Sequence, residues 1–393
     1  MILNNLLTAG MDDPVSIRVA DDKIESVSHR VFQESDDPFI LNFENAMVFP
    51  GLINSHDHLD FNLYPQLGHR TYSNYTEWGR HIHKNYKDEI ASVQKVPSVL
   101  RYEWGVFKNL LAGVTTVINH GEPSGLKNDL ITIFEDMQAL HSVGFEIAWQ
   151  LKLNNPFNTK RVVCIHVGEG DDWPSFNEID QLISWNLFRR ELIGVHAVAM
   201  SESQAKKFKA LVWCPQSNYF LLNKTAPVNL LKKSAEILFG TDSTLTGSWD
   251  IWEHLRLARQ TRLLNDDTLY DTLNINAAGI WGLNTGMLAP GKDADIVIAR
   301  NRTGMSGYHA FFATWPEDLL LVVHKGQIRL FDESMAPELR GVDFDNFSKI
   351  YVNGVGKYVQ GNLPGLMAQI LEYYPEAKFP VVSSLLTKTE NIL

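Results

Sequence analysis

The sequence has little cysteine and lacks long apolar runs. Only two cysteines occur among 393 residues, Cys164 and Cys214, which excludes a disulfide framework and a multi-thiolate metal site. No stretch reaches the roughly 18 consecutive apolar residues that a membrane span needs. The first residues also lack the basic segment and apolar core of a secretory signal. We therefore expect a soluble, cytoplasmic protein with no membrane partner.

The sequence also has fewer basic than acidic residues. Lys and Arg total 35 against 46 Asp and Glu, a formal net charge of -11, so no net field attracts phosphate backbones or anionic lipid. We expect no nucleic-acid partner. The hydrophobic fraction of 45% and charged fraction of 21% are those of an ordinary globular chain. The length predicts one large domain and a smaller one.

The pattern of apolar segments divides the chain into three stretches. Residues 1–50 carry short apolar runs broken by acidic turns, which predicts small antiparallel strands. Residues 51–285 alternate apolar strand candidates with amphipathic helix candidates, which indicates a parallel sheet covered by helices and favours a (β/α)8-type TIM barrel. From residue 286 the strand-rich texture returns, before a helix candidate near residues 364–374. We expect 1–50 and 286–393 to form one composite β-sandwich domain with a C-terminal helical extension.

The strongest local signal is a pair of histidines in PGLINSHDHL, at the end of an apolar strand candidate. Residues i and i+2 of a strand point to the same face, so His56 and His58 share one locus while Asp57 points away. A second pair, His81 and His83, lies in a polar, helical segment. Residues i and i+2 diverge on a helix, so we interpret that pair as surface or packing residues.

Further strand candidates also end in residues suited to metal or proton chemistry. RVVCIHVGE ends at His166 and Glu169, ELIGVHAV at His196, and EILFGTDS at Asp242. Barrel enzymes place their sites at the carboxyl ends of the strands, so these side chains are expected to converge with His56 and His58.

These motifs, together with GVTTV, HVGEG, CPQSN, FGTDS and the closing NAAGIWGLNTGMLAPGKDADIVI, resemble the amidohydrolase superfamily. The nearest branch is that of the aminohydrolases, which includes guanine, cytosine and S-adenosylhomocysteine deaminases and triazine hydrolases. The resemblance covers residues 1 to about 330, with the motifs in the expected order. It implies a metal-dependent hydrolase that attacks a C–N bond with metal-bound hydroxide, by hydrolytic deamination of an aminated heterocycle.

The resemblance also implies roles for individual residues. His56, His58, His166 and Asp242 would bind one divalent metal, and three imidazoles with one carboxylate suit Zn²⁺, or else Fe²⁺. Glu169 would protonate a ring nitrogen of a small-molecule substrate, and it is not a ligand. His196 would hydrogen-bond the attacking water or the developing oxyanion, while Asp242 would carry a proton to the departing ammonia.

Other candidates receive smaller roles. Cys164 is expected to be inert packing, and a pairing with Cys214 has little support. Ser217 and Asn218 shape the substrate mouth in the family, His120 faces the same mouth, and His254 is expected in helix packing or at the surface. A homodimer is a further expectation.

The stretch between His120 and His166 is short for this family. One helix at about 127–143 and one strand, FEIAWQLK, are expected there, so one βα unit is missing or reduced. The strand would end in Lys152, which leaves open a binuclear cyclic amidase or dipeptidase with a carboxylated bridging lysine. A third reading is a scaffold that has kept the fold and lost activity, although this chain keeps every ligand.

Overall fold

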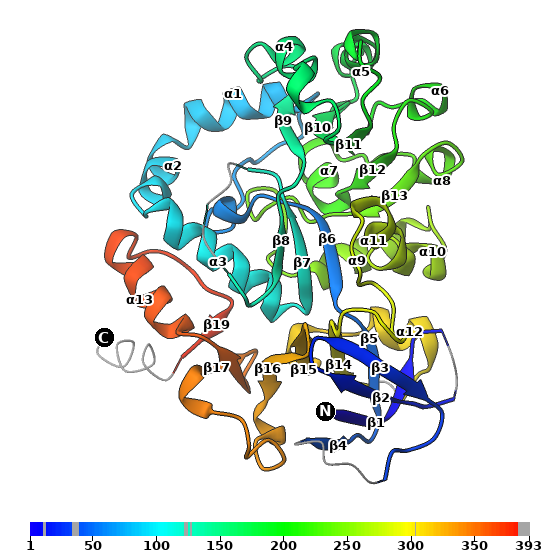
Figure 1. Ribbon diagram of the computed structural model, residues 1–393. Helices are drawn as coiled ribbons and strands as arrows, with labels where there is room; N and C mark the ends of the chain where they lie inside the picture. Colours follow the sequence, from blue (N-terminus) through cyan, green and yellow to red (C-terminus); the bar gives the residue numbers. More distant parts are fainter. Residues whose placement is uncertain (11–12, 34–38, 122–124, 126–127, 303, 384–393) are drawn as a thin grey trace.

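The computed structural model describes the chain except residues 11–12, 34–38, 122–124, 126–127, 303 and 384–393. Figure 1 shows a β-rich part with strands from both the N-terminal and the C-terminal segments of the chain, next to a larger part in which helices surround parallel strands.

The β-rich part is built on one sheet of eleven strands, in the order β19-β17-β18-β16-β15-β14-β5-β1-β2-β3, with β4 paired to β1. The N-terminal and C-terminal segments of the chain pair where β5 runs antiparallel to β14, with Val48 opposite Ile298. Both strands are apolar and buried, so neither segment would bury its strands alone. The strands are β1 (Ile2–Thr8), β2 (Val15–Ala20), β3 (Lys23–Ser28), β4 (Ile40–Asn42), β5 (Ala46–Pro50), β14 (Ile296–Arg300), β15 (Leu319–His324), β16 (Gln327–Asp332), β17 (Phe347–Val352), β18 (Val355–Gln360) and β19 (Val381–Val382).

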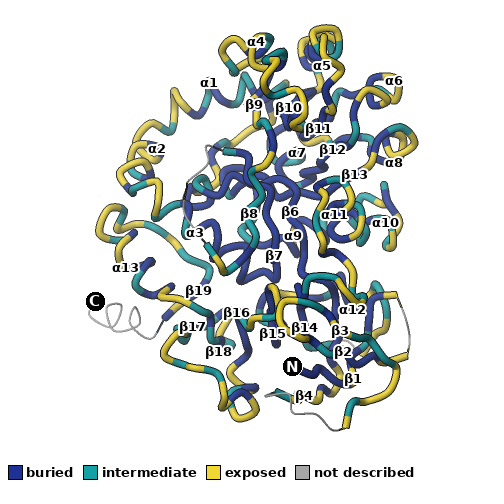
Figure 2. The backbone as a smooth tube through the Cα atoms, in the orientation of Figure 1, coloured by how far each residue is buried: buried dark blue, intermediate teal, exposed yellow. Residues whose placement is uncertain are grey.

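The larger part contains two parallel sheets, one of three strands in the order β6-β7-β8 and one of five in the order β13-β12-β11-β10-β9. Most of these strands are buried along their whole length (Figure 2), as expected for parallel strands covered by helices. They are β6 (Leu52–Asp57), β7 (Val114–Asn119), β8 (Thr132–Phe134), β9 (Gln138–Ser142), β10 (Val163–Val167), β11 (Leu192–His196), β12 (Ala210–Trp213) and β13 (Glu236–Phe239).

The two parallel sheets meet at the carboxyl ends of β6 and β13. The amide of Asp242 donates to the carbonyl of His56 at 3.0 Å, and the amide of His58 donates to the carbonyl of Asp242 at 2.9 Å. An isolated parallel bridge joins Asp57 to Asp242 at the same point. The backbone therefore brings the first and last of these parallel strands together where the polar side chains lie.

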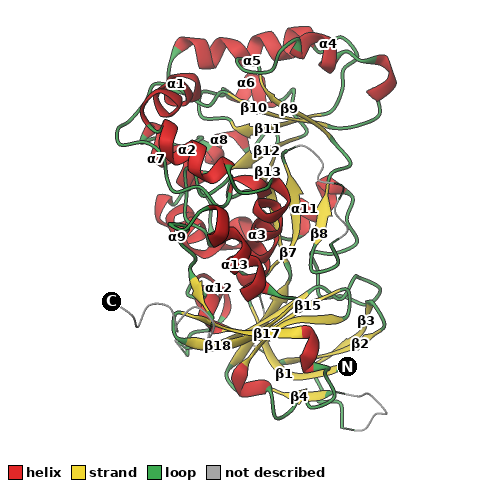
Figure 3. Cartoon of the chain, turned by 90° about the vertical axis from the view of Figure 1, so that its left-hand side faces the viewer, coloured by secondary structure: helices red, strands yellow, loops and turns green. Residues whose placement is uncertain are grey.

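The helices lie mainly outside the strands (Figures 1 and 3), and the amphipathic segments expected from the sequence form α3, α5, α9 and α13. The helices are α1 (Tyr75–Asn85), α2 (Lys87–Gln94), α3 (Ser98–Leu111), α4 (Trp149–Leu153), α5 (Trp173–Trp185), α6 (Glu202–Ala205), α7 (Pro215–Leu222), α8 (Val228–Leu231), α9 (Ile251–Thr261), α10 (Asp266–Asp271), α11 (Ile275–Trp281), α12 (Gly307–Phe312) and α13 (Leu363–Tyr373), and a short 3-10 turn, η1 (Leu59–Phe61), follows β6.

The predicted helix at 127–143 and the predicted strand FEIAWQLK are both wrong; residue 127 itself lies outside the described residues. The structure has strands β8 and β9 in place of the helix, and helix α4 in place of the second half of the strand. Only residues 135–137 separate β8 from β9, while β8 pairs with β7 and β9 pairs with β10. The parallel pairing of β8 with β7 and of β9 with β10 therefore overrides the helical pattern of this segment. The segment from β8 to β9 acts as an interrupted strand that links the two sheets.

Candidate active site

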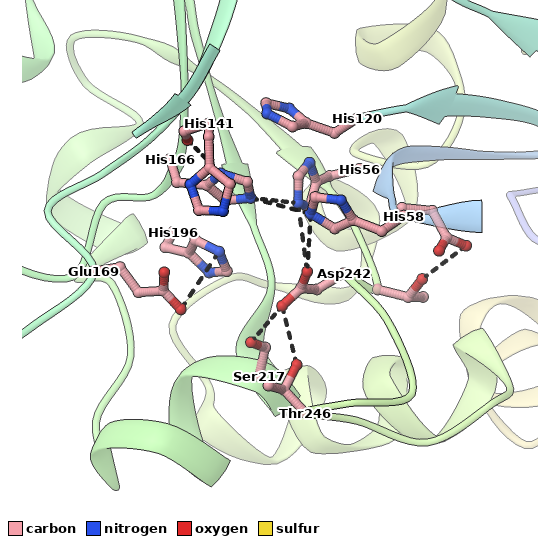
Figure 4. Close-up of polar contacts among 12 residues, drawn as sticks. His56, His58, His120, His141, His166, Glu169, His196, Ser217, Asp242 and Thr246 are labelled. Carbon is pink, nitrogen blue, oxygen red and sulfur yellow. Dashed lines mark hydrogen bonds and ion pairs between the residues drawn. The ribbon is translucent and has the colours of Figure 1, made fainter. Parts of the chain in front are cut away.

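Four side chains from strand ends of the two sheets meet at one point. His56 Nε2 lies 3.1 Å from His166 Nε2, and His58 Nε2 lies 3.3 Å from the same atom. Asp242 Oδ1 lies 3.6 Å from the Nε2 atoms of both His56 and His58. One ligand atom from each of the four residues falls within 4.8 Å of all the others, and all four residues are buried. Figure 4 shows this convergence.

The Nε2 atoms of the three histidines are directed inward, toward one another. His166 Nδ1 donates to the backbone carbonyl of His141 at 2.6 Å, so the proton sits on Nδ1 and Nε2 is free to ligate. Burial and the neighbouring histidines hold the pKa of His166 well below its usual range, and burial lowers the pKa of His58 to about 3. Neutral imidazoles are the form that binds a metal.

Asp242 contacts the histidines with one oxygen and hydroxyl groups with the other. Its Oδ2 accepts hydrogen bonds from Ser217 Oγ at 2.7 Å and Thr246 Oγ1 at 3.0 Å. Burial by itself would raise the pKa of Asp242, but the hydrogen bond with His56 and the surrounding imidazoles bring it well below the usual value. Asp242 and His196 have φ values of 66° and 71°, in the left-handed region that non-glycine residues rarely adopt. Such strain is characteristic of functional positions.

Glu169 lies beside the four-residue cluster without belonging to it. Its Oε1 is 3.6 Å from His196 Nε2, and only 6% of the residue is exposed. Burial, together with the nearby Asp242 and Glu178 carboxylates, raises the pKa of Glu169 well above its ordinary value. The structure therefore provides a carboxyl group that stays protonated at higher pH than an exposed one and can donate its proton.

These groups open into a cavity of about 540 Å³, a size that accommodates a small organic molecule. His58, His166, Glu169, His196 and Asp242 line it at the strand ends. The other walls are mostly aromatic and aliphatic, from η1, α1, α2 and the loop after β9. The main apolar lining residues are Phe61, Tyr64, Tyr75, Trp78, Ile82, Ile90, Phe145, Leu221 and Leu245.

His120 lies behind the cluster. Its Nε2 donates to the carbonyl of Leu140 at 3.1 Å, so its Nδ1 is an acceptor. The Nδ1 atoms of His120 and His56 are both buried, and neither has a hydrogen-bond partner among the described residues. A second group of possible ligand atoms, from His56, His120 and Cys164, lies within 4.8 Å.

The other sequence candidates lie in several places. Cys164 and Cys214 are buried in one apolar cluster, and burial raises the pKa of Cys164 to about 12, as for an inert thiol. His254 is buried in helix α9, where its Nε2 donates to the carbonyl of Ser248 at 3.1 Å. His81 and His83 lie on helix α1; His83 is exposed and borders the cavity.

Lys152 does not reach the site. It lies on helix α4 and not at a strand end, and its side chain, 53% exposed, pairs with Glu146. The prediction that Lys152 ends a strand is therefore wrong, and the alternative with a bridging lysine depended on it.

Asn218 is buried on helix α7, where its Nδ2 donates to His196 Nδ1 at 2.9 Å.

Sequence reasoning missed the residues that close the cavity. His141 lies near the carboxyl end of β9, a strand that was predicted as helix, so its position at the carboxyl edge of the sheet was not recognised. Tyr75, Trp78 and Phe145 lie on α1 and a loop, where an aromatic residue has no distinctive spacing. Trp78 Nε1 donates to the carbonyl of Leu67 at 2.7 Å, which fixes α1 against the segment after η1.

Comparisons with known proteins agree with this geometry. The model of the amidohydrolase family matches residues 175–329. Over 343 residues the chain is 23% identical to 5-methylthioadenosine/S-adenosylhomocysteine deaminase of Caldicellulosiruptor saccharolyticus, covering 72% of this chain and 80% of the relative. It is 21% identical to 5'-deoxyadenosine deaminase of Methanosphaera stadtmanae, covering 81% and 90%.

Solved structures show the same fold. Zinc-complexed atrazine chlorohydrolase of Arthrobacter aurescens superposes with a TM-score of 0.61 at 16% identity, over 83% of this chain and 94% of that one. Helicobacter pylori aminofutalosine deaminase superposes with a TM-score of 0.61 at 15% identity, over 83% and 99%. The family match over residues 175–329 and the similarity to the deaminases agree with the resemblance predicted from the motifs.

None of the helices in the described part of the chain is both long and apolar enough to cross a membrane.

Proposed function

We propose that this protein is a metal-dependent aminohydrolase that hydrolytically deaminates an aminated heterocycle. The observation that carries the proposal is Glu169, a buried carboxyl with a raised pKa that faces the cavity beside a three-imidazole, one-carboxylate cluster. Deamination of a ring requires a proton donor for the ring nitrogen in addition to activated water, and these two functions are separate here. The names of the relatives, which are deaminases of adenine derivatives, support it.

The side chains fit a single transition metal. His56, His58, His166 and Asp242 would hold it, since their ligand atoms are mutually close. The pKa values of His58 and His166 are lowered, which keeps these rings neutral, and a carbonyl orients the outer nitrogen of His166. Nitrogen-rich donor sets of this kind suit Zn²⁺ or Fe²⁺ and not Mg²⁺ or Ca²⁺, and the zinc-bound structural relative favours Zn²⁺. When bound, such a metal lowers the pKa of water towards neutrality and so supplies a nucleophile.

The remaining steps belong to the protein's own side chains. Glu169 delivers its proton to the ring nitrogen adjacent to the carbon under attack. His196 hydrogen-bonds the oxygen that develops negative charge. Asp242, held by Ser217 and Thr246, accepts a proton and passes it to the departing ammonia. The apolar walls exclude water and stack against a planar ring.

The architecture that follows from this proposal is a (β/α) barrel with one reduced unit. The interrupted β8–β9 strand would occupy the place where the barrel lost a helix, and residues 51–285 would form the barrel domain. Residues 1–50 and 286–393 would form the second domain, with its sheet folded as a sandwich. The homodimer and the cytoplasmic location stay predictions.

Release of ammonia is the test. Protein loaded with one equivalent of Zn²⁺ is screened against aminated purines, 5'-substituted adenosines, pterins and triazines, with cyclic amides as the comparison set. We expect ammonia from at least one aminated ring and no ring opening of the amides. Turnover of cyclic amides alone would move the protein to the cyclic amidases. No turnover of any set by metal-loaded protein would favour the inactive scaffold.

A further inference from the structure

We propose that Asn218 is a positioning residue that fixes the proton of His196 on Nε2, so that this ring donates a hydrogen bond into the cavity. Asn218 acts through His196 and does not touch the reacting atoms. The inference deepens the proposed function, because it specifies which way His196 can act in that reaction.

The direction of the hydrogen bonds follows from a group that can only donate. Trp213 Nε1 lies 2.6 Å from Thr225 Oγ1, and an indole N–H has no acceptor capacity, so the Thr225 hydroxyl accepts there. With one lone pair of Thr225 used in this way, its hydroxyl proton is available to Asn218 Oδ1, which it reaches at 3.3 Å. This assigns the amide oxygen of Asn218 to Thr225 and its NH₂ group to the ring.

The remaining step sets the state of the ring. Asn218 Nδ2 donates to His196 Nδ1 at 2.9 Å, so Nδ1 carries a lone pair and not a proton. A ring that accepts at Nδ1 is neutral and has its only proton on Nε2. That Nε2–H points to the side of Glu169, whose Oε1 is 3.6 Å away (Figure 4). His196 also lines the cavity.

Three of the four residues in this chain of hydrogen bonds are fully buried, and Thr225 is half-buried. His196, Trp213 and Asn218 are each no more than 1% exposed, so water does not compete for these groups. Trp213 ends strand β12, and Asn218 lies one turn into helix α7, where its amide donates to the carbonyl of Cys214 at 3.0 Å. The WCPQSN sequence thus joins a strand, a helix start and the relay in six consecutive residues.

This arrangement decides what His196 can do. A protonated Nε2 cannot ligate a metal or remove a proton from water, whereas it can donate to an oxygen that gains negative charge. Removing one such donor typically lowers kcat by about 10² to 10³. The effect is expected on kcat with little change in KM, because the hydrogen bond strengthens as charge develops.

The test reads the tautomer directly, without a substrate. Zn²⁺-loaded protein labelled with ¹⁵N-histidine is examined by long-range ¹H–¹⁵N correlation, which distinguishes a protonated from an unprotonated ring nitrogen. The His196 signals are identified as those missing from His196→Gln. We expect the proton of His196 on Nε2 in the wild type. A proton on Nδ1 in the wild type would overturn the proposal.

Two substitutions then break the relay at different points. Asn218→Asp presents only acceptors, so the proton should move to Nδ1 and kcat should fall about 10² to 10³ with KM within about threefold. Thr225→Val removes the hydroxyl while keeping the shape, and should give a mixture of tautomers with a smaller loss of kcat. Thr225→Ser keeps the hydroxyl and is the matched control, expected to behave as wild type. Because Thr225 lies outside the core, the Val and Ser pair serves even where Asn218→Asp does not fold.

The outcomes separate this inference from the proposed function. An unchanged tautomer in both Asn218→Asp and Thr225→Val would overturn the relay. A changed tautomer with unchanged kcat would overturn its role in the reaction. Wild-type protein that shows the Nε2 proton but deaminates nothing would leave the relay in place and contradict only the deaminase function.

Discussion

Asp57 and Lys108 form a fully buried ion pair directly beneath the histidines of strand β6. Lys108 Nζ lies 3.0 Å from Asp57 Oδ2, and neither side chain is more than 2% exposed. Asn54, Asn62 and Asn109 also donate to the Asp57 carboxylate, at 3.1, 2.7 and 2.8 Å. The residue between the two histidines therefore anchors the strand end that presents them.

Lys108→Met should be strongly destabilising, since it leaves the Asp57 carboxylate buried without a counter-charge. Breaking one partner of a buried pair typically costs about 3–5 kcal/mol. The free energy of unfolding, measured by denaturant titration, should fall by that amount. Lys349, which pairs with Glu333 at the surface, gives the control: Lys349→Met should change stability by under about 1 kcal/mol. Equal effects of the two substitutions would contradict the anchoring role.

A second prediction concerns Gly105, in the middle of helix α3. A Cβ atom there would lie 2.1 Å from the backbone oxygen of Leu59, the residue after His58, so only glycine lets the helix approach this closely. Gly105→Ala should therefore push η1 away, cost about 1–3 kcal/mol and weaken metal binding. Gly279 in helix α11 has open space around its Cβ position, so Gly279→Ala should stabilise by about 0.4–1 kcal/mol. Thermal melts and metal titrations of the two variants check this contrast.

A third prediction concerns pH and Glu178. This buried carboxyl accepts from the amide of Gly168 at 2.7 Å and the hydroxyl of Tyr75 at 3.0 Å, and burial raises its pKa to about 7. Between about pH 4.5 and 7, Glu178 is protonated in the folded state but has lost its proton in the unfolded state. Because the folded state binds more protons in this window, the free energy of unfolding that Glu178 contributes falls as the pH rises through it. The shift corresponds to roughly 3 kcal/mol.

Glu178→Gln removes that titration while keeping one acceptor for Gly168 and one donor for Tyr75. Stability of the variant relative to wild type should therefore increase as pH rises from 5 to 8. Unfolding free energies at several pH values measure the difference. A constant difference over this range would show that Glu178 is charged throughout.

The sequence predicted the site better than the path of the chain around it. Alternation along β6 placed His56 and His58 on one face with Asp57 on the other, because the two-residue period of a strand is a local property. His166, His196 and Asp242 were found because each follows an apolar run that ends abruptly. Helix and strand were exchanged between 132 and 152, where pairing with β7 and β10 decides the structure and both partners are distant in sequence.

The same reasoning explains why the supporting residues were missed. Lys108 and Asn109 lie inside an amphipathic helix, and both are buried. In the sequence of such a helix, a buried polar residue cannot be distinguished from a polar residue that faces solvent. The link from Trp213 to His196 joins two strand ends through a helix start and a loop. Such contacts depend on three-dimensional packing and have no periodic signature.

A fourth prediction concerns metal content. The four ligand atoms define a single position, so elemental analysis should find one equivalent of Zn²⁺ or Fe²⁺ per chain. His166→Ala should lose the metal and, with it, the stabilisation that ligand binding adds to the folded state, visible as a lower Tm that added metal no longer raises. His254→Gln, a change at a buried histidine away from the cluster, should keep full metal content. Two equivalents per wild-type chain would indicate a binuclear centre.

The last prediction tests Glu169 as the proton donor. Glu169→Gln is nearly isosteric and leaves the four ligands untouched, so the variant should keep its fold and its metal. It should lose catalysis by about 10² to 10⁴, because a positioned acid is typically worth that factor, or roughly 3 to 5 kcal/mol of transition-state stabilisation. The loss should fall on kcat, since the ring nitrogen gains basicity only as water attacks the adjacent carbon. Steady-state kinetics on the substrate found in the ammonia screen, with metal content measured on the same sample, separate this from the loss in His166→Ala, where metal and activity disappear together. Near wild-type turnover of Glu169→Gln would leave Asp242 as the only proton carrier and exclude the deaminase mechanism.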